Sequence, residues 1–161
     1  MENVAEVLKK NGIEAFVVEN GGEAKKKVME MIPAGAEVMV MSSVTAETVG
    51  LTELDTLKKQ LMKMDRATQG REMQKLGAAA EWAVGSVQAV TEEGQLVMAS
   101  NTGSQLGAYA YAAGHVIWVV GQQKIVKNLD EAFKRIYEHV LPLESERVKE
   151  AYGMSGSNVS K

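Results

Sequence analysis

The chain has 161 residues, a size typical of one domain, with 45% hydrophobic and 24% charged side chains. Its net charge of −3 argues against nucleic acid as the main partner, because a phosphate backbone is bound by a basic surface. It contains no cysteine, which excludes disulfides, thiolate nucleophiles and cysteine-ligated zinc or iron–sulfur centres within the chain.

The first part of the chain predicts alternating helices and strands. In chain order we expect a helix over residues 2–12, a strand over 14–20, a helix over 22–33 and a strand over 36–43. Strand, helix and strand in this order favour parallel pairing with a right-handed crossover.

The rest of the chain continues the alternation. Residues 44–65 and 66–81 have helical spacing broken near Gly50 and Gly70, and residues 82–100 predict two antiparallel strands joined at Glu92-Glu93-Gly94. A loop, a helix and a strand are expected over 100–121, an amphipathic helix over 128–142 and a last helix over 143–153. Asn128 and Glu131 form a plausible capping pair. One side of the amphipathic helix is apolar: Leu129, Ala132, Phe133, Ile136, Tyr137 and Val140. We therefore expect one α/β domain over residues 1–161, with a mostly parallel sheet, an antiparallel hairpin and a polar tail from about residue 154.

The loop after the strand over 36–43 is the first candidate ligand site. In open α/β sheets, ligands collect beyond the carboxyl ends of the strands. Ser42, Ser43 and Thr45 place hydroxyls and backbone amides where a helix begins, and such groups suit a phosphate or carboxylate. The alternative is that Ser43 or Thr45 only caps the helix.

A polar segment at Ser100–Gln105, called the hook, is the second candidate. Gly103 permits a sharp turn, and Thr102 and Ser104 flank it with hydroxyls. The spacing is neither that of a Walker loop nor that of a dinucleotide fingerprint. The alternative is a tight corner that lets the next helix pack closely against a sheet. Lys124, after the following strand, is the nearest cation that could meet a negative charge, or else an ordinary surface lysine.

The acidic residues and histidines give weaker signals. Glu92 at the hairpin turn and Glu47 near the first loop are the weak catalytic candidates, and a carboxylate at a turn is usually only exposed. His115 and His139 have no metal-ligand spacing with each other or with a carboxylate, so we expect no metal site. No cofactor can be named from the sequence.

Two segments carry a family resemblance. The LUD domain, the lactate-utilisation family, is similar to both. The first segment is residues 86–153, from "SVQAV" to "EAYG", and the second is "IPAGAEVMVMSSVTAETVGL". The resemblance implies a three-layer α/β/α sandwich like that of sugar-phosphate isomerases, CoA transferases and formyltetrahydrofolate cycloligases. It also implies an association with L-lactate oxidation, where one kind of member carries iron–sulfur clusters and another, like this cysteine-free chain, does not.

The resemblance matches the candidate loops residue by residue. It includes the first loop, the hairpin turn, the hook and the segment Gln123-Lys124-Ile125-Val126. CoA transferases place a catalytic glutamate in a Glu-Asn-Gly turn, whereas this chain has Glu93 in place of the asparagine. Some family members have an arginine just after the hook glycine, where this chain has Gln105.

Three functions follow as hypotheses. The first is a binding or accessory protein that holds a small anionic metabolite or cofactor in lactate or organic-acid utilisation. The second is a transferase or ligase acting on CoA esters, sugar phosphates or folates through Glu92 or Glu47. The third is a subunit that docks on an iron–sulfur partner protein.

Two further expectations concern assembly and location. Relatives continue after residue 158 with an apolar strand, whereas Val159-Ser160-Lys161 follows here, and an unpaired edge would favour a homodimer. No apolar run approaches the ~18 residues that span a bilayer, so we expect a cytoplasmic protein with no membrane contact.

Overall fold

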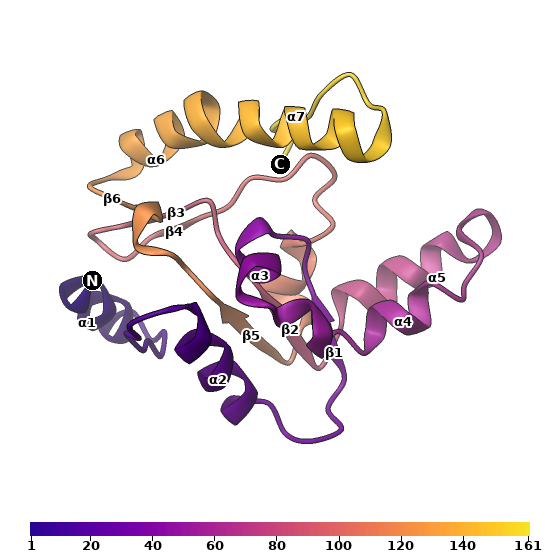
Figure 1. Cartoon of the computed structure of the whole chain (residues 1–161), viewed down its shortest axis with the longest axis horizontal. Coiled ribbons are helices and arrows are strands. Elements are labelled where there is room, and N and C mark those ends of the chain that lie inside the picture. Colours follow the sequence, from indigo (N-terminus) through magenta and orange to yellow (C-terminus); the bar gives the residue numbers. More distant parts are fainter. The chain divides into compact units, whose positions relative to one another are not determined.

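The computed structural model describes residues 1–161 (Figure 1). The chain divides into two units, each built from segments that are distant in the sequence. Unit 1 comprises Met1–Val17, Val87–Gly103 and Gly121–Lys161, and unit 2 comprises Val18–Ser86 and Ser104–Val120. The single domain over residues 1–161 stays a prediction.

The elements follow the expected alternation. The α-helices are α1 (Glu2–Lys10), α2 (Gly21–Met31), α3 (Val44–Val49), α4 (Leu57–Leu61), α5 (Arg66–Ala78), α6 (Leu129–Arg135) and α7 (Leu141–Tyr152). The strands are β1 (Val38–Val40), β2 (Trp82–Gly85), β3 (Ala89–Thr91), β4 (Leu96–Val97), β5 (His115–Trp118) and β6 (Ile125–Val126). Short 3₁₀ turns lie at Leu51–Leu54 and Gln122–Lys124, and π-helical turns at Ala108–Ala112 and Ile136–Val140. The predicted α/β class is confirmed.

Unit 2 contains an all-parallel sheet in the order β1-β2-β5, whose strands run side by side in Figure 1. Val40 pairs with Val84, which pairs in turn with Ile117. Side chains alternate between the two faces of a strand, so these three residues share one face. The same face packs against buried residues of the flanking helices: Val28 of α2, Ala46 of α3 and Leu51.

The opposite face of this sheet is covered by the π-helical turn. Tyr109 is buried and packs edge-to-face on Trp118, with ring centroids 5.8 Å apart. A Cβ added at Gly85 would overlap the Tyr109 hydroxyl, so a side chain at this position would collide with the turn. Helical segments on both faces of the sheet give unit 2 three layers, as an α/β/α sandwich requires.

Unit 1 contains the second sheet, in the order β4-β3-β6. The predicted antiparallel hairpin is confirmed: β3 and β4 pair antiparallel, and Gly94 takes the positive φ of the turn at +82°. β6 pairs parallel to β3, and this two-residue strand was not expected from the sequence. The hairpin therefore belongs to a sheet of its own and not to the parallel sheet of unit 2.

Local hydrogen bonds explain where several helices begin. The Asn128 side chain accepts the Glu131 amide at 3.0 Å, which confirms the predicted cap of α6. The Asn20 side chain likewise accepts the Glu23 amide at 3.0 Å and caps α2. α6, the following π-helical turn and α7 run as one continuous helical rod in Figure 1, up to Gly153 with φ +64°.

Three expectations of secondary structure are wrong. Residues 14–20 form no strand, because no other strand pairs with them and Phe16 and Val17 are about half exposed. α5 runs through Gly70 without a break, since this glycine keeps a helical backbone and costs only about 1 kcal/mol relative to alanine. The first predicted hairpin strand is split at Ser86–Gln88 into β2 and β3, which pair in different sheets.

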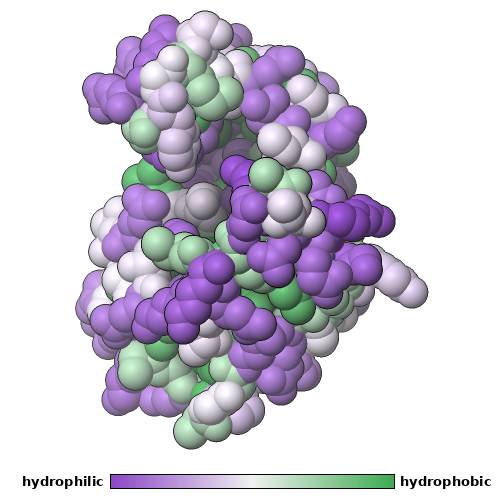
Figure 2. All heavy atoms as spheres, turned by 90° about the vertical axis from the view of Figure 1, so that its right-hand side faces the viewer, coloured by the Kyte–Doolittle hydropathy of each residue, from purple (hydrophilic) through white to green (hydrophobic).

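The apolar side predicted for residues 128–142 is only partly buried. Ala132 and Ile136 are 0% and 2% exposed, because α6 packs on β3, whereas Phe133 and Tyr137 are 51% and 55% exposed. α5 has no buried residue, and Figure 2, which faces the side where α5 lies, shows mostly hydrophilic side chains with smaller apolar patches. None of the helices combines the length and the apolar character needed to cross a membrane.

Candidate functional site

In unit 2, polar loops gather at the carboxyl edge of the parallel sheet. Ser42 and Ser43 follow β1, and Ser86 follows β2. Gln105 reaches this edge as well, because its Nε2 donates to the Ser42 carbonyl at 2.9 Å. The structure thus joins the first loop to the residue directly after Ser104, 63 positions further along the chain.

Several groups at this edge already have structural partners. Ser43 Oγ accepts the Ala46 amide at 3.4 Å, so this serine caps α3, as the structural alternative expected. Ser86 is 7% exposed, and its hydroxyl donates to the Val119 carbonyl at 2.6 Å, where it ties the end of β2 to the end of β5. Ser42 and Ser104 are exposed and Thr45 is half-buried, and these three could contact a ligand at this edge.

The first part of the hook lies in unit 1. Gly103 has φ +78°, and its amide donates to Ser100 Oγ at 2.9 Å. The Ser100 amide donates to the Lys161 carbonyl, and the Lys161 amide donates back to the Ser100 carbonyl, both at 3.0 Å. The Gly103 amide is therefore bonded within the hook, and any anion held there depends on other groups such as the exposed Thr102 hydroxyl.

Lys124 is half-buried in unit 1, at the end of the turn that leads into β6. Its Nζ donates to the Val87 carbonyl at 2.9 Å. Burial, and next the positive charge of Arg135, lower the pKa of Lys124 to about 8. The sequence predicted Lys124 as a cation that could meet a negative charge. In the structure its amine is held by the Val87 carbonyl and is affected by the positive charge of Arg135.

Arg135 is the functional candidate that the sequence analysis missed. It lies in the last turn of α6, and its Nε donates to the Gln88 carbonyl at 3.0 Å. The two cations therefore hold the carbonyls of two consecutive residues, Val87 and Gln88. A basic residue near a helix C-terminus is common, so its spacing in the sequence gave no signal of this role.

The weak catalytic candidates lie in different units. Glu92 is exposed at the hairpin turn of unit 1, where its amide donates to the Val126 carbonyl at 2.9 Å. The next residue of that turn, Glu93, accepts a hydrogen bond from Asn11 of α1 at its carbonyl. Glu47 is exposed on α3 of unit 2. Neither glutamate is set in a buried polar arrangement of the kind that tunes a catalytic carboxylate.

The all-parallel sheet with helical segments on both faces defines unit 2 as an α/β sandwich. The family model of the LUD domain matches residues 1–158. The chain belongs to the LUD domain family, which confirms the resemblance seen in the two sequence segments and extends it over nearly the whole chain. No curated protein and no solved structure is significantly similar to it.

Proposed function

We propose that this LUD-domain protein binds a small organic anion, with a carboxylate such as that of lactate or pyruvate, in an accessory role in lactate or organic-acid utilisation. The observation that carries the proposal is the pair of cations, Lys124 and Arg135, held at the carbonyls of Val87 and Gln88. Membership of the LUD family supports the metabolic setting.

The geometry of Arg135 suits a carboxylate. Its Nε–H is used by the Gln88 carbonyl, which fixes the plane of the guanidinium, and its terminal Nη groups make no hydrogen bond within the protein. A guanidinium with a fixed plane can offer two parallel N–H groups to a carboxylate, and such charge-assisted bonds are about twice as strong as neutral ones.

Electrostatics favour an anion at the same place. Each cation opposes the other, because the charge of Arg135 contributes to the lowered pKa of Lys124. A bound carboxylate would offset this repulsion and the cost of keeping Lys124 charged in a half-buried place. The other residues predicted to contact the ligand stay predictions. Thr102 and Gly103 lie in unit 1, and Ser42, Ser43, Thr45 and Ser104 lie in unit 2.

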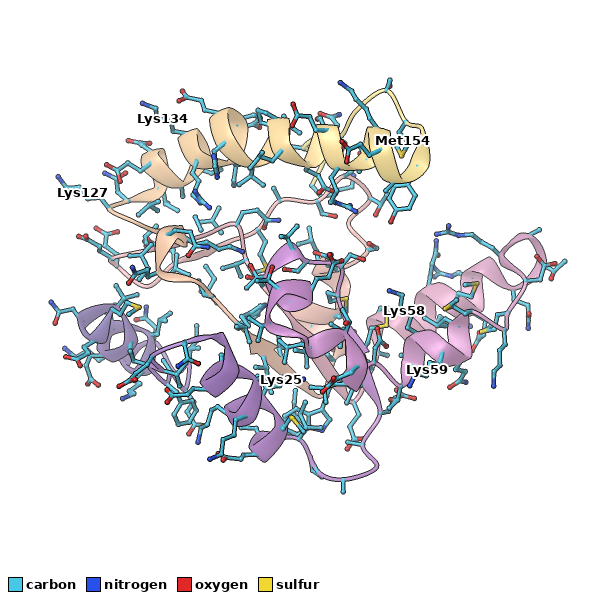
Figure 3. The ribbon with its side chains drawn as sticks, in the orientation of Figure 1. Lys25, Lys58, Lys59, Lys127, Lys134 and Met154 are labelled. Atoms are coloured by element: carbon cyan, nitrogen blue, oxygen red, sulfur yellow. The ribbon has the colours of Figure 1, made fainter.

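The test is a titration of the full chain with lactate, pyruvate, phosphate, CoA and a folate, followed by calorimetry and thermal unfolding. Lys124→Met and Arg135→Met should each weaken binding of the preferred anion by about tenfold or more, that is about 1.4 kcal/mol. Lys134→Met is the matched control, because Lys134 lies on the same helix, is exposed and points away from the ribbon in Figure 3.

Two results would contradict the proposal. One is that no anion raises the unfolding temperature at high concentration, since a ligand that binds the native state but not the unfolded chain must do so. The other is that the Lys124 and Arg135 variants bind like the Lys134 control. A transferase or ligase activity, an iron–sulfur partner and a homodimer stay predictions that no observed feature of the structure favours.

A further inference from the structure

An amine and a guanidinium are anchored next to each other on one short backbone segment. Lys124 reaches the Val87 carbonyl from the turn before β6, and Arg135 reaches the Gln88 carbonyl from α6. Val87 is 1% exposed, so this segment is part of the interior and gives both cations a fixed support. Both nitrogen groups are therefore anchored on one short segment, where the charge of Arg135 acts on Lys124, and each group can do different chemistry.

The amine has an unusual protonation state for a lysine. Because burial and Arg135 lower its pKa to about 8, a sizeable share of Lys124 side chains is neutral just below that pH. A neutral amine has two N–H groups and one lone pair. One N–H can keep the bond to the Val87 carbonyl while the lone pair acts as a nucleophile, and a neighbouring cation is a known way to activate such a lysine.

We propose that Lys124 forms an imine with the carbonyl carbon of a 2-oxo acid whose carboxylate is bound by Arg135. This inference rests on the proposed function, because it needs the same anion to bind at the same pair of cations. The Lys124 nitrogen attacks the carbonyl carbon, and one of its protons moves to the carbonyl oxygen to give a carbinolamine. The second amine proton then moves to the same oxygen, which leaves as water when the C=N bond forms. The step consumes one amine and one carbonyl, releases one water and needs no oxidant or reductant.

The class of substrate follows from the two groups. In a 2-oxo acid the carboxylate is bonded directly to the electrophilic carbon. The guanidinium can therefore bind the carboxylate while the amine attacks the neighbouring carbon. A 2-hydroxy acid such as lactate has the same carboxylate but no electrophilic carbon, so it would bind without reacting. Oxidation of a 2-hydroxy acid at the carbon that carries the hydroxyl group is one class of reaction that supplies such a substrate.

The experiment traps the imine on the full chain. The protein is incubated with pyruvate and a borohydride reductant, and the product is analysed by intact mass and by peptide mapping. We expect one reduced pyruvyl group, located on Lys124, at least tenfold above the exposed lysines Lys127 and Lys134, which point away from the ribbon in Figure 3. Labelling should increase as the pH rises towards 8 and decrease when lactate competes.

Three variants separate the roles of the two side chains. Lys124→Arg keeps a cation but has no reactive amine, so it should still bind pyruvate while losing the label. Arg135→Met keeps the amine but lacks the carboxylate contact, so labelling by pyruvate should fall by about tenfold. Acetone, which has a carbonyl but no carboxylate, should label wild type weakly, and Arg135→Met should reduce its labelling less than it reduces labelling by pyruvate. Circular dichroism and urea unfolding identify any variant that fails to fold, and Lys124→Gln replaces Lys124→Arg if the latter does not fold.

The failures are distinguishable. If pyruvate and lactate bind but Lys124 is labelled no more than Lys127 and Lys134, the imine is refuted and the proposed function stands. If acetone labels Lys124 as well as pyruvate does, the role of Arg135 is refuted. If neither acid binds, the proposed function and the inference fail together.

Discussion

Gly85 offers a quantitative test of the packing between the parallel sheet and the π-helical turn. A Cβ at this position would overlap the Tyr109 hydroxyl and lie 3.0 Å from Tyr109 Cζ and 3.1 Å from Met41 Cβ. β2 cannot easily move away, because the Gly85 carbonyl accepts the Val119 amide at 2.8 Å and the Val84 carbonyl accepts the Met41 amide at 2.8 Å. We expect Gly85→Ala to lower the free energy of unfolding by about 3 kcal/mol, at the upper end of overpacking.

The second arm of this test removes the atom that would collide. The Tyr109 hydroxyl is buried near the Ser86 amide without an ordinary hydrogen bond, and burial raises the pKa of Tyr109 to about 12. Tyr109→Phe alone should therefore cost less than about 1 kcal/mol. In the double variant the Cβ gains room, and we expect a coupling energy of about 1 to 2 kcal/mol between the two sites.

The assay can report on unit 2 directly. Both tryptophans of the chain, Trp82 and Trp118, lie in unit 2, so urea unfolding followed by intrinsic fluorescence measures the unit that contains Gly85. Thermal unfolding should show a loss of about 2–4 °C per kcal/mol for Gly85→Ala. If the double variant loses the sum of the two single losses, the hydroxyl is not what excludes the side chain, and the reasoning is refuted.

Three further predictions concern turns and charged groups. Gly12 and Gly94 both have φ near +80°, but a Cβ at Gly94 would lie 2.7 Å from Asn11 Nδ2, while nothing lies near Gly12. Gly12→Ala should therefore lower the free energy of unfolding by about 1 kcal/mol, and Gly94→Ala by about 1 kcal/mol more. Equal losses of stability in thermal melts would contradict this. Burial raises the pKa of Asp55, so the native state holds this proton more tightly than the unfolded chain does. The free energy of unfolding should therefore fall as the pH rises from about 4 through the raised pKa. Asp55→Asn should remove this pH dependence in urea titrations. The lowered pKa of Lys124 has the opposite consequence: between about pH 8 and 10.5 the unfolded chain binds more protons, so stability should rise with pH in wild type, and a slope retained in Lys124→Met would disprove the assignment.

Features that depend on neighbours in the sequence were predictable. The cap at Asn128 and the hairpin turn at Gly94 follow from local hydrogen bonding and from the freedom of glycine at positive φ, and both are confirmed. The capping alternative for Ser43 was visible for the same reason. Caps and glycine turns depend on only a few neighbouring residues, so they change little with the packing of the rest of the chain.

Strand formation was harder to predict, because a strand exists only with a partner. Residues 14–20 have the apolar composition of a strand but no partner, whereas Ile125–Val126 gave little signal and pairs with β3. The segment from Trp82 to Thr91 is continuous in its apolar pattern, and the choice of different partners for β2 and β3 divides it.

The sequence by itself determined the α/β class, the family, the helix starts and the glycine turn, because periodicity and capping act over a few residues. Only the tertiary structure placed Arg135 beside Lys124, since the two side chains come from different elements and meet at carbonyls that lie 37 and 47 positions away from them. The same long-range packing lowered the pKa of Lys124, because burial and a neighbouring charge are properties of the folded chain and not of any short segment of it.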